Sequence, residues 1–413
     1  MNKLFVISMF ATFTFYFQLI TFNCVAQTAY IPNRGDSSVS VINIATNTVS
    51  ATIKVDSLPL GVSVSQDGEK VYISNYGTKK VSVINTATNT VSAKVSVGPG
   101  PSGLYVTPDG SKVYVANDDT NTVSVISTAT NTVSATIKVG DYPVGIAVSP
   151  DGSKVYVTNE GTNTVSEIFT ASDLVFATIN VGPGPAGICV TPDGNKVYVT
   201  NFNTDTVSVI SSATNTVSAT IKVGNYPSGI CVTPDGSKVY VTNRGDNTVS
   251  VINTAADTVL ATIIVGSLPF GICVTPDGKK VYVADYGSNS MDIINVATNT
   301  VSAACAVGAH PMSYGNFIST YGTGITSLST VSENINVYPS PATNNITIDN
   351  PQAVIGSWPS AVIEITNIQG QLVKTISTAG NKTNIDVSGF PCGVYVIEVK
   401  TENGVEVKKF IKE

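Results

Sequence analysis

The sequence is poor in charge and in the side chains that most often carry catalysis. Only 12% of its 413 residues are charged, the net charge is −6, and there are two arginines (Arg34 and Arg244) and one histidine (His310). No nucleic-acid partner is expected, because binding to a phosphate backbone needs a basic surface. The sequence also lacks a nucleophile elbow, a phosphate-binding Walker loop and the CxxCH and HExxH motifs. We therefore predict no catalytic residue and no dedicated metal site.

Cysteines are few, and their spacing does not suggest disulfides. Cys189, Cys231 and Cys273 are 42 residues apart, so they occupy one position in three successive repeats. This spacing does not fit a zinc site, and no cysteine of the same repeat could pair with them. We interpret the three thiols as small apolar fillers on inner strands.

A long apolar run occurs only at the N-terminus. Lys3 precedes an apolar and aromatic stretch from Leu4 to Phe22, and Cys24-Val25-Ala26 offers small residues to a signal peptidase. We interpret residues 1–26 as a signal peptide that is cleaved after Ala26. The alternative is an uncleaved anchor, but the stretch is barely long enough to span a bilayer and contains Thr and Gln. A stable transmembrane anchor is therefore not expected.

What the sequence does have is a repeat. A tyrosine recurs every 42 residues without insertion or deletion, and a proline recurs in the same register. The tyrosines are Tyr30, Tyr72, Tyr114, Tyr156, Tyr198, Tyr240 and Tyr282, and the prolines are Pro59, Pro101, Pro143, Pro185, Pro227, Pro269 and Pro311. A repeat of this length with four short strands predicts an all-β, seven-bladed β-propeller.

The clearest copy predicts four strands, at Gly229–Thr233, Lys238–Asn243, Thr248–Ile252 and Thr258–Val265. The "TPDGSK" and "NTAADT" segments form the turns after the first and third strands. In the first copy, Val49, Ala51 and Ile53 alternate with polar residues. This pattern predicts an outer strand with one buried face.

The phase of the repeat predicts how the ring closes. The first copy begins at its second strand, at Tyr30, whereas the last copy ends after a first strand near Pro311 to Ile318. We expect this last strand to complete the blade begun by residues 28–55. Such closure joins the two ends of the propeller and leaves no exposed sheet edge.

The remainder of the chain has no 42-residue period. Residues 319–333 form a Ser/Thr/Gly-rich linker, and residues 334–413 form a second domain. Its expected strands are Ile346–Ile348, Ala361–Asn367, Val394–Lys400 and Val405–Ile411, with turns at Gln369-Gly370 and Asn403-Gly404. We predict a small antiparallel β-sandwich.

The repeat resembles the YVTN family of seven-bladed propellers. The residues that carry the resemblance are "VYVTN" (for example Val239–Asn243), "NTVSVI" (Asn121–Ile126) and "SPDG" or "TPDG" at each tight turn. It covers residues 27–318 and implies a fold rather than a function. Similar propellers occur in surface-layer proteins, lactonase-like enzymes and redox proteins.

The second domain resembles the type IX secretion C-terminal sorting domains of the Bacteroidota. The matching segments are Asn336–Ile348, Ile363–Ile376, Asp386–Val399 and the closing Lys408–Glu413, with Ser340 replacing the family's usual Asn. The resemblance implies that residues 334–413 are recognised by the type IX secretion machinery. It also implies export to the cell exterior, with either release or attachment to the surface.

Two of the four connections in each repeat vary between copies, and strand parity places both at one end of the propeller. Loops on a rigid scaffold commonly carry function. We therefore expect a ligand-binding face around the channel mouth there, formed by Arg34, Tyr76, Asp119, Tyr142, Glu160, Phe202, Tyr226, Arg244, Tyr286 and His310. Aromatic residues with Asn and Asp suit a glycan, peptide or surface-polysaccharide ligand. The alternative is that these are ordinary variable loop residues, with His310 in a structural role.

Three functions fit these features. The first is a secreted or surface-held binding module without a cofactor. The second is an extracellular lactonase-like hydrolase or lyase, with Glu160 or Asp119 holding a metal. The third is a surface-coat component without a discrete ligand. Asp118, Asp119, Asp205 and Asp285 could also bind calcium, although no loop has an EF-hand-like spacing.

Overall fold

The computed structural model describes residues 27–319, 336–349, 361–367, 372–378, 382–401 and 404–412. The predicted signal peptide and all but the first residue of the predicted linker lie outside these ranges. The chain divides into two compact units, residues 1–325 and 326–413.

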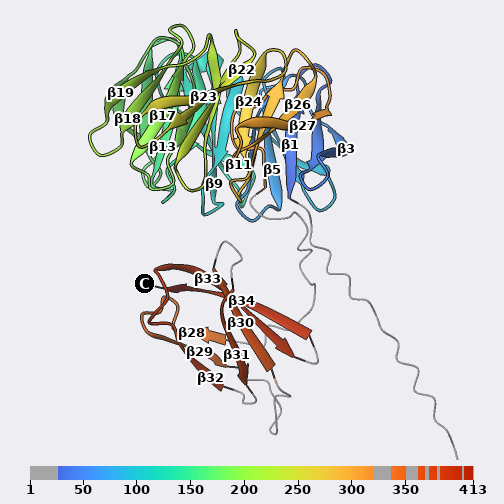
Figure 1. Cartoon of the computed structure of the whole chain (residues 1–413), viewed down its shortest axis with the longest axis vertical. Coiled ribbons are helices and arrows are strands. Elements are labelled where there is room, and N and C mark those ends of the chain that lie inside the picture. The colour runs from blue at the N-terminus through green and yellow to red at the C-terminus, as the bar shows by residue number, and fades with distance from the viewer. Residues whose placement is uncertain are drawn as a thin grey trace, which may run out of the picture. The chain divides into compact units, whose positions relative to one another are not determined.

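The first unit contains six antiparallel sheets of four strands that follow one another along the chain, and each forms one blade (Figure 1). Blade 2 holds β4 (Pro59–Val64), β5 (Lys70–Asn75), β6 (Lys80–Asn85) and β7 (Thr90–Ser96). Blade 3 holds β8 (Pro101–Val106), β9 (Lys112–Asn117), β10 (Thr122–Ser127) and β11 (Thr132–Lys138), with a short 3-10 turn, η1 (Asp118–Thr120), between β9 and β10. Blade 4 holds β12 (Pro143–Val148), β13 (Lys154–Asn159), β14 (Thr164–Phe169) and β15 (Leu174–Asn180).

The remaining complete blades repeat this order. Blade 5 holds β16 (Pro185–Val190), β17 (Lys196–Asn201), β18 (Thr206–Ser211) and β19 (Thr216–Lys222). Blade 6 holds β20 (Pro227–Val232), β21 (Lys238–Asn243), β22 (Thr248–Asn253) and β23 (Thr258–Ile264). Blade 7 holds β24 (Pro269–Val274), β25 (Lys280–Asp285), β26 (Ser290–Asn295) and β27 (Thr300–Ala306). The predicted strands are confirmed to within two residues at each end.

Blade 1 is assembled from both ends of the propeller, as the phase of the repeat predicts. It holds β1 (Thr28–Asn33), β2 (Ser38–Asn43) and β3 (Thr48–Lys54). Residues 311–319, called the closing segment below, pair antiparallel with β1 through Ala29–Ile318 and Asn33–Pro311 bridges. The Tyr30 N–H donates to the Phe317 carbonyl at 2.8 Å. In Figure 1, the blue strands of blade 1 accordingly lie beside the orange strands of blade 7.

The outer strands bury one face only, as the alternation predicts, but the alternation is shorter than expected. In β3, Ile53 is buried and Ala51 is half-buried, whereas Val49 is exposed. A bulge between Val41 and Ile42 of the neighbouring strand shifts the register at this point. The shift turns the first residues of β3 away from the core.

The threonine of the recurring VYVTN segment joins neighbouring blades. In blade 6, the Thr242 hydroxyl accepts from the Gly229 N–H at 2.8 Å and donates to the Phe270 carbonyl of blade 7 at 2.9 Å. A Cβ at Gly229 would lie 2.2 Å from that same carbonyl oxygen. Only glycine therefore allows the inner strands to approach this closely.

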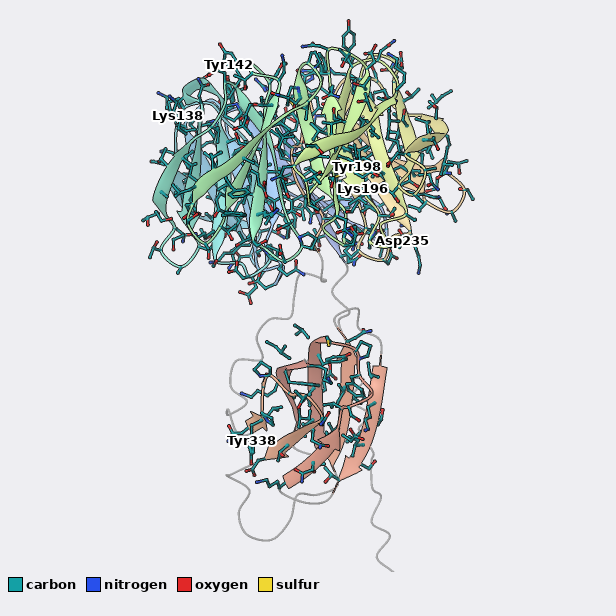
Figure 2. The ribbon with its side chains drawn as sticks, turned by 90° about the vertical axis from the view of Figure 1, so that its left-hand side faces the viewer. Lys138, Tyr142, Lys196, Tyr198, Asp235 and Tyr338 are labelled. Carbon is teal, nitrogen blue, oxygen red and sulfur yellow. The ribbon has the colours of Figure 1, made fainter. Side chains whose placement is uncertain are left out.

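The recurring Lys and Tyr at the start of the second strand hold the next blade at its other end. Lys196 Nζ lies 2.9 Å from Asp257 Oδ2 of blade 6, and the Tyr198 hydroxyl donates to Asp257 Oδ1 at 2.7 Å. Lys196 and Tyr198 lie close together in Figure 2. Equivalent contacts are Lys112 and Tyr114 with Asp173, Lys238 and Tyr240 with Asn299, and Lys280 and Tyr282 with Asn47. The last of these joins blade 7 to blade 1.

The apolar core lies between blades rather than within them. One cluster, for example, combines Tyr198 and Val207 of blade 5 with Ile230 and Val239 of blade 6. Another combines Tyr30 of blade 1 with Tyr282 of blade 7 and Val62 of blade 2. The contact between blades 7 and 1, where the ring closes, therefore buries the same kind of apolar interface as the contacts between the other blades.

The second unit is a two-sheet β-sandwich around one apolar core, as predicted. One sheet holds β28 (Asn336–Tyr338), β29 (Asn345–Asp349) and β32 (Lys382–Asp386), and the other holds β31 (Leu372–Thr378), β30 (Ala361–Asn367), β33 (Gly393–Thr401) and β34 (Gly404–Lys412). Three of these strands, β28, β31 and β32, were not predicted. The Gln369-Gly370 turn lies outside the described residues. Across the parts of the chain that the structure describes, no helix has the length and hydropathy of a membrane span.

Candidate functional site

The two variable loop sets meet at one end of the propeller. Within a blade, backbone hydrogen bonds join them: the Glu160 N–H donates to the Tyr142 carbonyl at 2.9 Å, and the Arg244 N–H donates to the Tyr226 carbonyl at 3.1 Å. Figure 2 shows Tyr142 at this end and Asp235, in a PDG turn, at the opposite end. The end with the variable loops is called the loop face below.

Three of the predicted site residues have a defined place in the loop framework. Tyr142, Tyr226 and His310 share one repeat position, and all three have a positive φ between 53° and 55°. A Cβ on Gly161 would lie 2.6 Å from Tyr142 Cδ2, and one on Gly245 would lie 2.7 Å from Tyr226 Cδ2. The tyrosine rings therefore cover a glycine of the adjacent loop. They remain 57% and 51% exposed.

On blades 1 to 3, an arginine, a tyrosine and an aspartate form a continuous chain of contacts. Arg34 Cζ lies 5.7 Å from the centroid of the Tyr76 ring, and the Tyr76 hydroxyl donates to Asp119 Oδ1 at 3.3 Å. Asp119 belongs to η1, where blade 3 has Asp118-Asp119 instead of the glycine-containing loop of most blades.

Next to Arg34, Tyr76 and Asp119 lie two carboxyl groups whose charged form is disfavoured by burial. Burial raises the pKa of Asp118 to about 6, with further contributions from the Asp119 and Glu160 carboxylates. Burial also raises the pKa of Glu160. Neither residue takes part in a salt bridge among the described residues. These two carboxyl groups of the loop face therefore have no ion-pair partner in the described part of the protein.

Tyr314 of the closing segment joins the two sides of the mouth. Its ring packs edge-on against Phe270, with 4.9 Å between centroids. Burial raises the pKa of Tyr314, the Glu160 carboxylate raises it further, and a hydrogen bond with Ser228 and the Arg244 charge lower it. The Tyr314 hydroxyl therefore lies within the electrostatic reach of groups from blades 3, 4 and 6.

The far side of the mouth is aromatic and basic. Arg244 Cζ lies 5.8 Å from the Phe270 centroid and 5.9 Å from the Tyr286 centroid. The Tyr286 ring stacks on His310 at 4.6 Å between centroids. Contact with a ring, and a Cβ position on Gly35 only 2.9 Å from His310 Cδ2, give His310 a packing role.

The structure thus groups most of the predicted site residues but not all of them. Arg34, Tyr76 and Asp119 form one linked set, and Glu160, Arg244, Tyr286 and His310 form a second set linked through Tyr314 and Phe270. Phe202 and Tyr226 form a separate pair, with 5.0 Å between centroids. Sequence reasoning did not assign Tyr314, Phe270 or Ser228 to the site. The available signal was Tyr314 itself, an aromatic residue where the other repeats have Val, Leu or Ile.

Beneath the mouth, the inner strands enclose a channel cavity of about 200 Å³. Cys189, Cys231 and Cys273 line it together with Tyr105 and Tyr314. The thiols lie on inner strands and are unpaired, as predicted, and burial raises their pKa. They border a cavity, however, rather than filling tightly packed space. The reason is that seven inner strands leave an open axis.

No group of three or more His, Cys, Asp or Glu side chains in the described part of the chain is placed to share a metal ion. Asp205, one of the predicted calcium candidates, instead accepts from the Tyr226 N–H at 3.0 Å and pairs with Lys222 at 3.2 Å. These contacts lower its pKa.

Comparison with known proteins gives matches to both units. Residues 62–155 match a model described as YNCE-like beta-propeller, and residues 211–307 match one described as Lactonase, 7-bladed beta-propeller. Residues 336–413 match a secretion system C-terminal sorting domain. No match was found among curated proteins.

Two solved structures have a similar fold. Hydrazine synthase from Kuenenia stuttgartiensis shares 26% identity at a TM-score of 0.61, over 65% of this chain and 92% of that one. A functionally unknown protein from Desulfotomaculum acetoxidans shares 19% identity at a TM-score of 0.62, over 71% of this chain and 98% of that one. With the closed ring of seven blades and the matched tail, the chain is a seven-bladed β-propeller that carries a C-terminal sorting domain of the type IX secretion system.

Proposed function

We propose that the propeller, residues 27–318, is a binding module that acts outside the cell and holds its ligand at the channel mouth of the loop face. The observation that carries this proposal is the desolvated pair Asp118 and Glu160, which lies beside Tyr314 without a partner cation among the described residues. Lys196 and Asp257 at the opposite end form an ion pair across two blades, whereas Asp118 and Glu160 at the mouth form no salt bridge among the described residues. A binding site commonly retains such unneutralised charge on a rigid scaffold.

The chemistry of the mouth favours a ligand that combines a cationic group with a flat or apolar face. Asp118, Asp119 and Glu160 offer carboxylates, while Tyr76, Tyr286 and Tyr314 offer aromatic surface. An amino sugar in a glycan, or a basic side chain in a peptide, has both features. The sorting domain supports delivery of this module to the exterior. The predicted signal peptide, residues 1–26, is proposed to provide the first export step.

A glycan array and a peptide array with the full-length secreted chain test this proposal. We expect binding that the double variant Asp118→Asn/Glu160→Gln weakens at least about tenfold, because it removes both charges that face the cationic group. Glu69→Gln is the matched control, since Glu69 is exposed beside the turn at the opposite end. Equal weakening by Glu69→Gln, or an unaltered affinity in the double variant, contradicts a site at the mouth.

A hydrolase is the second candidate, because residues 211–307 match the lactonase model. The test is turnover of simple lactones, followed by the triple substitution of Asp119, Glu160 and His310. Turnover that depends on these residues favours the hydrolase. If the chain neither binds on the arrays nor turns over lactones, the surface-coat function remains the better account.

A further inference from the structure

Blade 7 differs from the other six blades at one buried polar position. In those six, the second strand ends in a fully buried asparagine whose amide donates to the third strand. The Asn243 amide, for example, donates to Thr248 Oγ1 at 3.0 Å and to Ser250 Oγ at 2.9 Å. The same bond to the serine is present from Asn33, Asn75, Asn117, Asn159 and Asn201, at 2.9 to 3.0 Å.

In blade 7 the amide donor and its serine acceptor are both replaced by carboxyl groups. Asp285 stands at the asparagine position and is 0% exposed, and Asp292 stands at the serine position and is 9% exposed. The Gly266 N–H donates to Asp292 Oδ2 at 2.8 Å. Neither carboxyl oxygen of Asp285 has a hydrogen bond of good geometry, and weaker contacts with the Asp292 N–H and the Ser290 hydroxyl only partly offset the effect of burial on its pKa. Two buried carboxylates facing each other would be strongly unfavourable.

The surroundings offer no positive charge to the pair. On β26 the neighbours of Asp285 are Ser290 and Asp292, and on β27 the nearest titratable group is Cys305, whose pKa burial and Asp292 raise. β24 contributes only the Cys273 thiol, which lines the channel. No lysine, arginine or histidine in the described part of the chain forms a salt bridge with either aspartate.

We propose that Asp285 is held as a neutral carboxylic acid that donates its proton to Asp292, so that the pair replaces the framework amide and makes blade 7 a pH-sensitive joint beside the channel mouth. A protonated carboxyl has nearly the shape of an asparagine side chain and keeps a donor where the amide nitrogen lies in other blades. Loss of that proton removes the bridge between β25 and β26 and leaves two buried negative charges. Burial, and then Asp292, raise the pKa of Asp285 to about 8.

The joint lies next to the mouth in sequence and in contact. Asp285 directly precedes Tyr286, whose N–H donates to the Leu268 carbonyl at 3.1 Å and whose ring stacks on His310 and under Arg244. Deprotonation therefore loosens the strand end from which this side of the mouth is built. The inference does not depend on the proposed function.

The direction of the pH effect follows from the raised pKa. Folded Asp285 keeps its proton up to about pH 8, whereas an unfolded aspartate loses it near pH 4. Stability from this proton is therefore fully present below about pH 4 and is lost as the pH rises towards about 8. Each pH unit within this window lowers the folding constant by up to about tenfold.

Denaturant unfolding of the full chain between pH 5 and pH 9 tests the joint, with Asp285→Asn and Asp285→Asn/Asp292→Ser as variants. The double variant restores the motif of the other blades. We expect the ratio of folding constants, variant over wild type, to rise at least about tenfold between pH 5 and pH 8 for both variants and then to level off. A ratio that does not change with pH overturns the shared proton.

Two further measurements distinguish a shared proton from a general loosening of the fold at high pH and from a bound cation. The protection of backbone amides in residues 266–292, measured relative to their intrinsic exchange rate at each pH, is expected to fall above pH 8 in the wild type but not in the double variant; an equal fall in both would contradict the joint. The unfolding series is repeated with 5 mM calcium chloride and with chelator. Stabilisation by calcium that Asp285→Asn abolishes would show that the pair holds a cation instead of a proton, and it would overturn the proposal.

Discussion

At the end of the propeller that carries the PDG turns, lysine and aspartate side chains form ion pairs across blades, whereas two carboxyl groups at the channel mouth of the loop face have no salt-bridge partner among the described residues. Lys196, Tyr198 and Asp257 satisfy one another across the boundary between blades 5 and 6. Asp118 and Glu160 instead lie near each other, partly buried, with raised pKa values. The same 42-residue unit thus stabilises the ring at one end and accepts a cost at the other. Stability given up in this way is typical of functional sites.

The largest effect is expected where blades approach most closely. Gly229→Val would place side-chain atoms on the Phe270 carbonyl, from which a Cβ would already lie only 2.2 Å. Because backbone and not a flexible side chain is in the way, we expect a loss of at least about 3 kcal/mol in the free energy of unfolding. Thr220→Val on an exposed outer strand is the control for a valine in this scaffold. A similar loss in both variants would contradict the tight inner rim.

A smaller effect is expected from the contacts that link blades at the PDG end. Tyr198→Phe removes a 2.7 Å hydrogen bond to the Asp257 carboxylate and should cost about 1–2 kcal/mol in denaturant unfolding. Tyr156→Phe in blade 4 is the matched comparison, because Asn215 of the next blade bonds to Glu167 instead. If both variants lose the same stability, the hydroxyl contact with the next blade is not the cause.

The smallest expected change in stability has opposite signs at Asp118, whose pKa is raised, and at Asp205, whose pKa is lowered. Folded Asp118 has a raised pKa of about 6, so its proton stabilises the fold below about pH 4, and this stability is lost as the pH rises to about 6. Asp118→Asn should therefore gain about 1 kcal/mol over wild type at pH 7, a figure reduced for solvent screening of a half-buried group, but little at pH 4. Asp205 has a lowered pKa, and its contribution is present above pH 4 and lost on acidification. Asp205→Asn should accordingly lose stability at pH 7, as thermal unfolding at both pH values can check.

The fold was largely predictable from the sequence because the residues that make the framework contacts recur in seven copies. A single blade leaves the role of Tyr240 ambiguous, but the 42-residue recurrence of the tyrosine shows that it belongs to the framework. Strand ends were misplaced by up to two residues, since β20 begins at Pro227, where a bulge separates the proline from Ile230. In the sandwich, Leu372–Thr378 has no strong alternation and was missed.

The candidate site was less predictable because it depends on which residues of different blades converge. Variability between copies located the loop face but did not separate the mouth, with Glu160 and Arg244, from the rim pair Phe202 and Tyr226. Tyr314 comes from the closing segment, so only the ring places it beside residues of blades 3, 4 and 6. Asp285 and Asp292 are single departures from the repeat, and their importance depends on their mutual approach within the sheet.

Closure by residues 311–319 also sets the order in which this molecule can be completed. Blade 1 lacks its inner strand until residues 311–319 have been synthesised, so a chain that ends before them is an open arc of blades with an unpaired edge at β1. The ring can therefore close only in a chain that has been synthesised as far as residues 311–319, shortly before the sorting domain begins. A chain truncated before residue 311 would therefore keep an exposed β1 edge that could pair with other strands.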